Sequence, residues 1–422
     1  MTAALVSTAA MSIGAIAATL RLHPLVPFAA FAVALAVLVV GAVRRRVEAP
    51  WDRFARPLVV IAVLAALLDR HVNVASSAVA PDDVLAVLVV IAAFTLPAQR
   101  RWLALGAGLV LATYVMSAAI LIAASPYHSD AVVAAHGGAE LVLAGREPYA
   151  DFDMIDQLAR FGLRPEYATP LEDGTRLRAL QYPALAVLVP APLIAAGLAD
   201  VRVLYLVEVL AIFGLAMASV ALRWRAVVLA VCVGNVVVLD QFVLAGVDPL
   251  WALLVLVAWV WRRHLWSAVP LGLAIATRQP AWLVAPFVIA WTWRRAGPGR
   301  ALVRAAIALG IALLVHAPYL ASAPGLLLAS VTAPALLPLE PWGVGPAKLL
   351  ADTVGPIVPR VLFVVAAGVA YVAALWAVAT SGLRLNAPVV LPLLPLWLSW
   401  RALQSYFAFL PLFATLGDDA DR

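Results

Sequence analysis

The chain has 422 residues, of which 65% are hydrophobic and only 12% are charged. Soluble domains typically carry about 25% charged residues, so the composition excludes an ordinary soluble domain and predicts an all-α polytopic membrane protein. The net charge of +6 does not indicate nucleic-acid binding, because the arginines stand at the ends of apolar segments, as topology signals do.

The N-terminal apolar segments are expected to be retained membrane spans, since no basic region precedes the first of them as in a signal peptide. Spans are expected near residues 5–20, 25–43, 57–69, 84–98 and 102–124. The arginines between residues 44 and 56 and at 100–101 should face the cytoplasm. The fifth span then carries the chain outward, so the 125–181 loop is predicted to be extracytoplasmic.

The external loop opens with YHSDAVVAAHGG, residues 127–138. Residues 131–144 are predicted to form a short amphipathic helix that begins at Ser129 or Asp130 and ends at Gly145. Asp130 has two interpretations. It is either a helix N-cap or a general base that accepts the proton of a sugar hydroxyl, which contributes about 10²–10⁴-fold to the rate.

Two histidines flank Asp130. With it, His128 and His136 could form a metal site, since imidazole and carboxylate are ordinary ligands, but their spacing is not a recognised ligand pattern and we expect no metal. His128 is a candidate for hydrogen bonding to an acceptor or a phosphate, and the alternative for both histidines is plain polar surface. Cys232 is the only cysteine, which excludes an intramolecular disulfide and a Cys-rich metal site.

The apolar run at 182–198 is predicted not to cross the membrane. The next run, at 203–222, must return the chain to the cytoplasmic Arg223 and Arg225, so both runs cannot cross. Prolines at 183, 190 and 192 remove backbone donors and break a helix. We therefore expect a re-entrant or interfacial segment beside a cavity, because irregular backbone at membrane depth must line protein or water.

The later apolar runs predict further spans, several of them shorter than the ~17–25 residues of a full crossing. They lie near 226–242, 249–261, 265–277, 281–293, 305–321, 357–379, 387–400 and 405–416. The expected total is about 11–14 crossings, with a second external loop at 322–356.

Six segments after the first 100 residues carry a family resemblance. They are Asp130 after a span, GREPY (145–149), YPAL with its proline-rich run (182–192), LDQFVLAGVDPLWALL (239–254) and PLGLAIATRQPAWLVAPF (270–287), followed near the end by WRALQSYFAFLPLF (400–413). In this order they resemble the GT-C glycosyltransferases that use polyprenyl-phosphate donors, and are most similar to glycosyltransferase family 87.

The sequence departs from the family pattern at four points. Ala184 stands where a second proline is common, Asp240 and Gln241 replace a Gly-Gln pair, and Arg278 replaces a lysine. The first 100 residues are additional. The resemblance implies a GT-C-like catalytic membrane domain at 101–422, preceded by extra transmembrane helices at 1–100.

The resemblance implies an inverting transferase with Asp130 as the base and cations that bind the departing phosphate. Arg278 is the first candidate, since an arginine at membrane depth costs about 2.5–3.5 kcal/mol and is functional by default; the alternative is a snorkelling arginine at an external turn. Arg401 is the second, with a topological role as its alternative, and Lys348, the only lysine, is the third.

Further residues of these segments are candidates to bind the substrate. Carboxylates and amides fix sugar hydroxyls, and an aromatic ring can stack on a sugar, although aromatic residues also mark membrane interfaces and the two motif tyrosines could lock the loop instead. The candidates are His128, Tyr149, Gln181, Tyr182, Asp240, Gln241, Gln279, Trp342, Gln404 and Tyr406. Asp248, which precedes Pro249, is expected to start the next helix.

The expected function is transfer of a sugar, with mannose favoured, from a polyprenyl-phosphate donor to a glycolipid or lipoglycan acceptor at the outer face of the plasma membrane. The lipid-linked sugar is a co-substrate, and no cofactor, metal or nucleic acid is expected. An arabinofuranosyl donor is the nearest alternative. A transporter or flippase of a lipid-linked anion is the alternative from another class, because broken helices and membrane arginines suit transport too.

Overall fold

The computed structural model describes residues 2–19, 22–43, 100–221, 225–246, 248–355, 359–383 and 385–416. Within these ranges the chain is predominantly helical, and the one described sheet pairs β1 (Trp342–Gly343) in parallel with β2 (Arg401–Ala402). The expected spans at 57–69 and 84–98 lie outside the described residues.

Three described helices are long and apolar enough to cross a membrane: α2 (Leu25–Val43), α17 (Pro298–Ser322) and α20 (Arg360–Thr380). An α-helix rises 1.5 Å per residue, so about 20 residues match the ~30 Å hydrocarbon core. Helices α1 (Thr2–Thr19) and α5 (Arg100–Ala124) overlap the spans predicted at 5–20 and 102–124. The coarse prediction of an all-α membrane protein is confirmed.

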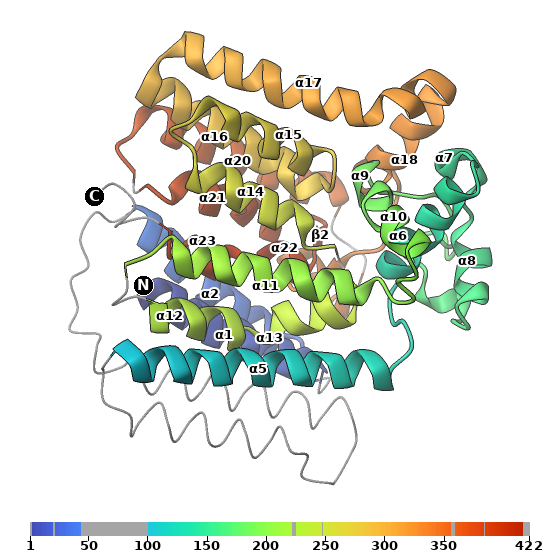
Figure 1. Ribbon diagram of the computed structural model, residues 1–422, viewed down its shortest axis with the longest axis horizontal. Coiled ribbons are helices and arrows are strands. Elements are labelled where there is room, and N and C mark those ends of the chain that lie inside the picture. Colours follow the sequence, from blue (N-terminus) through green and yellow to red (C-terminus); the bar gives the residue numbers. More distant parts are fainter. Residues whose placement is uncertain are drawn as a thin grey trace, which may run out of the picture. The chain divides into compact units, whose positions relative to one another are not determined.

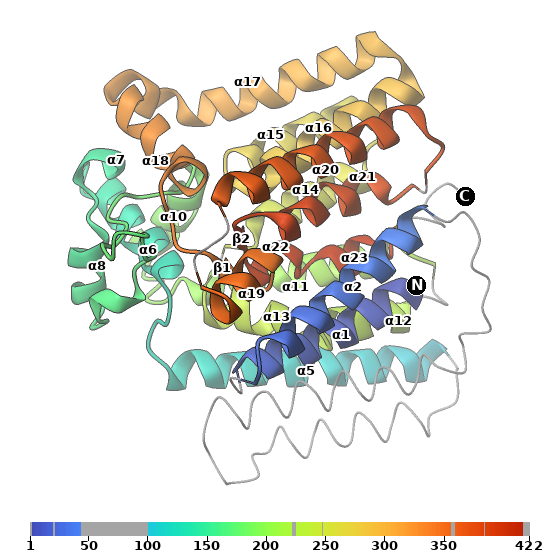
Figure 2. The same ribbon diagram turned by 180° about the vertical axis from the view of Figure 1, so that it is seen from behind.

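The described chain forms two compact units. Unit 1 comprises the described residues of Met1–Leu121, Phe213–Asp240 and Pro341–Arg422, and unit 2 comprises those of Ile122–Ile212 and Gln241–Glu340. In unit 1, α1 packs along α2, and both α12 (Arg225–Val233) and α23 (Leu410–Phe413) lie against α1 (Figure 2). Helix α19 (Pro346–Thr353) lies against α2 and the small sheet.

The predicted span at 226–242 is not one continuous helix. It divides into α12, α13 (Val236–Val238) and the π-helical η3 (Leu239–Leu244). The chain breaks after α12 at Gly234, whose carbonyl oxygen accepts a hydrogen bond from Ser12 at 3.0 Å, and at Asn235, whose amide donates to the Ala408 carbonyl oxygen at 2.7 Å. Polar contacts with other elements thus replace helical hydrogen bonds at this point.

The last two predicted spans are also irregular. The run at 387–400 forms α21 (Ala387–Val390) and then the 3₁₀ helix η5 (Leu391–Leu398), while the run at 405–416 forms α22 (Gln404–Phe407) and α23. Pro392 and Pro395 lie within or at the start of η5, and Pro411 lies at the start of α23. Each proline lacks a backbone donor and so removes one hydrogen bond of a continuous α-helix.

Unit 2 contains four apolar helices that lie side by side in Figures 1 and 2: α14 (Leu250–Val260), α15 (Ala268–Ile275), α16 (Gln279–Ala296) and α17. The short helix η4 (Leu265–Ser267) connects α14 to α15. Arg304, buried on α17, donates to the carbonyl oxygens of Arg262 and His264 and to the Thr292 hydroxyl. The arginine therefore ties the turn after α14 to α16 and α17.

The loop predicted at 125–181 folds into short helices of unit 2 that gather beside one another (Figure 1). They are α6 (Asp130–Leu143), α7 (Pro148–Asp151), α8 (Met154–Arg160) and η1 (Pro165–Tyr167). Helix α18 (Pro324–Leu336) packs on α7. The predicted helix at 131–144 is confirmed: Ser129 is its N-cap, and Gly145 follows it with φ of +67°.

The proline-rich run at 182–198 forms two short helices, α9 (Leu185–Leu188) and α10 (Pro190–Ala195), and both pack on α6. Gly138 of α6 allows α9 to pack closely, because an added Cβ would lie 2.6 Å from Val187, and Gly137 does the same for α8, where an added Cβ would lie 2.5 Å from Gln157. The segment divides at Val189, directly before Pro190, as expected from the prolines, and Gly138 lets its first helix lie close to the loop helix.

Candidate functional site

Asp130 starts α6 but does not cap it. The Ser129 hydroxyl accepts the Ala131 N–H at 2.9 Å and serves as the N-cap. Oδ2 of Asp130 accepts two hydrogen bonds from Thr169, one from its N–H at 3.1 Å and one from its hydroxyl at 2.7 Å, while Oδ1 has a 3.5 Å contact with the Ser129 hydroxyl. One carboxylate oxygen is thus held in place and the other retains acceptor capacity.

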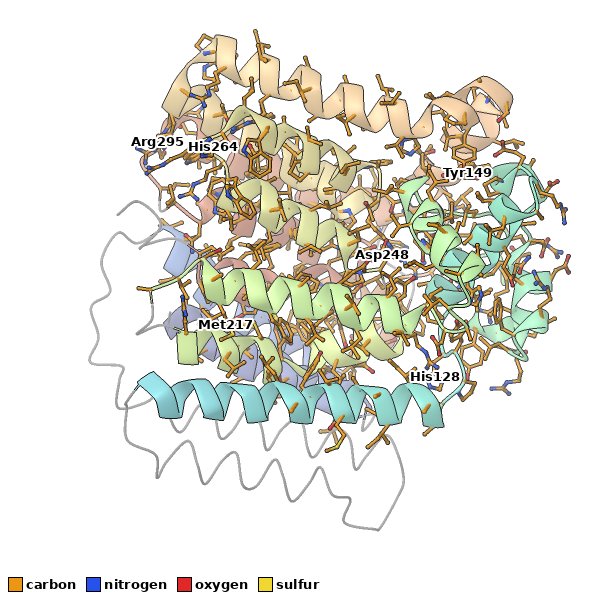
Figure 3. The ribbon with its side chains drawn as sticks, in the orientation of Figure 1. His128, Tyr149, Met217, Asp248, His264 and Arg295 are labelled. Atoms are coloured by element: carbon orange, nitrogen blue, oxygen red, sulfur yellow. The ribbon has the colours of Figure 1, made fainter. Side chains whose placement is uncertain are left out.

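His136 is buried, so its interpretation as plain polar surface is wrong. Its Nδ1 lies 2.8 Å from the Tyr127 hydroxyl, and its ring lies against Phe161. Burial is the main cause that lowers the pKa of His136, and Arg160 adds to it, while Glu140 and Asp200 oppose it. His128 is exposed at the end of α5, before α6 (Figure 3).

We expect acidification to destabilise the loop through His136. Its pKa is lowered in the folded state, so the unfolded state takes up a proton first as the pH falls below about 6.5, and the free energy of unfolding then falls by at most about 1.4 kcal/mol per pH unit. Limited proteolysis of the loop between pH 7.5 and 5 measures this. In His136→Asn the proteolysis rate should not change with pH over the range where that of the parent rises. An equal pH dependence in both proteins would contradict the assignment of this effect to His136.

Arg202 holds the end of α5 to the start of α11 (Arg202–Ala218). Its buried guanidinium donates to Asp200 and to the carbonyl oxygens of Ile122, Ser125 and Pro126, and it stacks on the Tyr127 ring at 5.1 Å. Sequence reasoning gave this arginine no role. Its donors are directed at backbone carbonyls, which indicates a structural clamp.

Arg278 lies at the N-cap position of α16, and its guanidinium stacks on the Tyr182 ring at 3.8 Å. The side chain is only 6% exposed. Its Nε and Nη2 have no hydrogen-bond partner among the described residues. These two N–H groups form one edge of the guanidinium, the edge that binds an oxyanion in a bidentate manner. The alternative of a snorkelling arginine at an exposed turn does not fit this burial.

Three buried groups that sequence reasoning did not assign to the site surround Arg278. Tyr205 and Glu208 lie three residues apart on α11, and Asp248 precedes α14. Asp248 interacts by charge with Arg278 and by a side-chain hydrogen bond with Glu208, and Tyr205 interacts with all three. Glu208, in the otherwise apolar stretch YLVEVLAIF, was a signal available in the sequence, since a carboxylate at membrane depth is a candidate functional residue.

Asp248 also starts α14, as predicted, because its Oδ1 accepts the Leu250 N–H at 2.8 Å. In Figure 3 it lies at the end of α14 opposite His264, and Arg295 lies at the same end as His264. The buried group around Arg278 and the arginine-rich turns are therefore at opposite ends of these helices of unit 2.

Gly246 connects the group around Arg278 to the loop helix. Its φ is +67°, and an added Cβ would lie 2.4 Å from Cβ and 3.3 Å from Cα of Val132 on α6. Val132 lies two residues after Asp130, and Gly246 lies two residues before Asp248. The close approach therefore holds the base candidate and the buried carboxylate in neighbouring parts of one unit.

We expect Gly246→Ala to lower the free energy of unfolding by about 2–5 kcal/mol, since a left-handed conformation costs about 1–2 and overpacking about 1–3. Gly174→Ala is the matched control, because Gly174 has φ of +81° and an added Cβ there meets no described atom within 4 Å. The control should lose only the part of the free energy of unfolding that the left-handed conformation costs, about 1–2 kcal/mol. Thermal unfolding in detergent compares the two, and equal losses would show that the contact with Val132 contributes nothing.

The other predicted residues of unit 2 have structural contacts. The Tyr149 hydroxyl donates to the Tyr182 carbonyl oxygen at 2.9 Å, so Tyr149 locks the loop. The Gln279 amide donates to the carbonyl oxygens of Gln181 and Val331 at 2.7 and 3.1 Å, which joins α16 to the loop and to α18. Gln241 lies in η3, and Asp240, its neighbour, belongs to unit 1.

The remaining candidates belong to unit 1. Trp342 pairs with Arg401 in the small sheet, and Lys348 stacks over the Trp342 ring at 5.5 Å and forms an ion pair with Asp352. Gln404 and Tyr406 are half-buried in α22. The structure brings these five residues into the same unit, whereas Asp130 and Arg278 belong to unit 2.

In the described ranges, no group of three or more His, Cys, Asp or Glu residues could hold a metal ion. No match was found in comparisons with protein-family models, with curated proteins or with solved structures.

Proposed function

We propose that the chain is a membrane glycosyltransferase that transfers a sugar, mannose in the first place, from a polyprenyl-phosphate donor to the hydroxyl of a glycolipid or lipoglycan. Asp130 accepts the proton of the attacking hydroxyl, and Arg278 binds the phosphate that leaves. The resemblance of the motifs to glycosyltransferase family 87 and the chemistry of these two side chains support the proposal.

The observation that carries it is the contact between Gly246 and Val132. It joins the segment next to Asp130 to the segment of Asp248, which interacts with Arg278. A transferase needs a base and a phosphate-binding cation in one site, because the base acts on the acceptor while the cation stabilises the charge that develops on the leaving group.

The arginine-rich turns support an extracytoplasmic site. Arginines prefer the cytoplasmic side. Arg263 lies in the turn after α14, Arg294 and Arg295 lie in the last turn of α16, and Arg300 lies in the first turn of α17, all at the helix ends far from Arg278. We therefore assign the end with Arg278 and the loop helices to the outer face of the plasma membrane.

The test is a product assay with the purified full-length protein. The protein is offered polyprenyl-phosphate mannose, arabinofuranose and other sugars in turn, together with a membrane glycolipid extract, and products are identified by mass spectrometry. A mannosylated lipid is expected. If a product forms only with the arabinofuranosyl donor, the transferred sugar is arabinofuranose and not mannose. If no product forms with any donor, the chain is not a transferase of these sugars.

Transport of a lipid-linked anion is the second candidate, and the buried Glu208 of α11 favours it, since carboxylates inside a membrane bundle often mark transport pathways. Movement of a fluorescent polyprenyl phosphate between the leaflets of reconstituted vesicles tests it. Transport without glycolipid product would replace the first proposal by this one.

A further inference from the structure

The buried residues around Arg278 contain more hydrogen-bonding groups than their neighbours satisfy. Glu208 is 5% exposed, Asp248 3% and Tyr205 1%. Within the described part of the chain, Oε2 of Glu208, the Tyr205 hydroxyl, and Nε and Nη2 of Arg278 lack hydrogen-bond partners. Unsatisfied polar atoms are rare in native interiors, since each costs about 1–3 kcal/mol, and four in one group indicate an occupant.

The contact between Glu208 and Asp248 determines where a proton lies. Two carboxyl groups form a hydrogen bond only when one of them is protonated. Asp248 accepts the Leu250 N–H and interacts with the charge of Arg278, and both favour its ionised form. Glu208 also interacts with the charge of Arg278 but accepts no N–H in the described part of the chain, so the proton lies on Glu208.

This protonation makes the group suitable for an anion. With Glu208 neutral, the charges of Asp248 and Arg278 cancel, whereas two ionised carboxylates would leave a net negative charge that repels an anion in a low-dielectric environment. Because the single proton of Glu208 is donated to Asp248, the donors left for a ligand are the Tyr205 hydroxyl and the bidentate edge of the Arg278 guanidinium. Their common partner is an oxyanion with several acceptor oxygens, as a phosphate has.

We propose that Tyr205 is a further donor to the phosphate that Arg278 binds, that Asp248 is the fixed counter-ion, and that Glu208, as a neutral carboxylic acid hydrogen-bonded to Asp248, keeps the site free of a second negative charge. The inference rests on the proposed function, because the phosphate is that of the lipid-linked donor or product. It adds one binding residue and gives the two carboxyl groups different roles: Glu208 stays neutral and does not repel the anion, whereas the ionised Asp248 limits the affinity for it.

The experiment measures binding of farnesyl monophosphate, a short polyprenyl phosphate, to the purified full-length protein by calorimetry, with no turnover required. Glu208→Gln keeps an uncharged donor to Asp248 and should bind within about twofold of the parent. Glu208→Leu removes that donor, so that Asp248 pairs more strongly with Arg278, and it should weaken binding by about tenfold or more. Tyr205→Phe should weaken binding similarly. Asp248→Asn keeps the helix cap and removes the opposing charge, so binding should become about tenfold tighter.

The outcomes separate this inference from the proposed function. If Glu208→Leu folds and binds as tightly as the parent, or if Glu208→Gln binds much more tightly because a negative charge has been removed, the inference is wrong even where glycolipid product forms. If the predicted order of affinities is found but no sugar is transferred, the phosphate site stands and the transferase proposal fails. Thermal unfolding of each variant identifies any that does not fold. If Glu208→Leu does not fold, the affinity of Glu208→Gln decides the question.

Discussion

We expect Asp130→Asn to lower kcat by about 10²–10⁴-fold, the contribution of general base catalysis, with little change in the affinity for the lipid-linked donor. Asparagine preserves the shape of the side chain, and its Oδ1 can still accept from Thr169, but the amide accepts no proton from the attacking hydroxyl. Because Ser129 rather than Asp130 caps α6, the helix should remain folded. Initial rates with saturating donor measure the effect.

Two variants of the same loop control for this substitution. Asp153→Asn makes the same chemical change at the N-cap of α8, where Asp153 accepts the Ile155 N–H, and it should leave kcat within a few-fold. Ser129→Ala removes the true cap of α6 and should cost about 1 kcal/mol of stability with only a small effect on rate. If Asp130→Asn retains substantial turnover, or if Ser129→Ala loses as much, Asp130 is not the base.

The local part of the loop could be predicted because its signals are close in sequence. Ser129, the 131–144 pattern and Gly145 are start and stop signals of one helix, and all three act as expected. The prolines of 182–198 break the segment that contains them for an equally local reason. Such signals depend on backbone chemistry and not on a distant partner.

Other parts depend on partners that no spacing rule supplies. Thr169 meets Asp130 across 39 residues, and His136 becomes buried only because Tyr127 and Phe161 surround it. Asn235 breaks a predicted span by bonding to Ala408 across 173 residues. Apolar periodicity predicts that a segment is helical and buried, but hydrogen bonds between distant residues decide where it bends.

The roles of the buried arginines also could not be predicted from spacing along the sequence. Arg202, Arg278 and Arg304 all lie at the ends of apolar segments or within them, and the sequence distinguishes them poorly. Arg202 donates to carbonyl oxygens and to Asp200, and Arg304 donates to carbonyl oxygens and to the Thr292 hydroxyl. Arg278 leaves an edge without a described partner. The same residue type is a clamp in two places and a candidate anion site in the third, and only tertiary structure separates them.

We expect Arg278→Lys to lower kcat/KM for the lipid-linked donor by about 100-fold. Lysine keeps the positive charge beside Asp248, so the carboxylate is not left uncompensated, which for a buried pair would cost about 3–5 kcal/mol. It loses the bidentate edge and the stacking on Tyr182. Losing hydrogen bonds to a charged phosphate costs about 1.5–3 kcal/mol, or roughly 10–150-fold. Donor titrations at fixed acceptor measure the change.

Arg202→Lys is the matched control, because it makes the same exchange at a buried arginine of the same unit that binds backbone carbonyls. Arg202→Lys should lower the melting temperature without a specific loss of donor affinity. Arg278→Lys should lower the donor affinity with little change in the melting temperature. The double variant Arg278→Leu/Asp248→Asn removes both charges, so it should fold better than Arg278→Leu alone and still fail to bind donor. Unchanged donor affinity in a folded Arg278→Lys or double variant would exclude Arg278 from phosphate binding. The Nε and Nη2 groups of Arg278, which have no described partner, would then have to bind a ligand other than the donor phosphate.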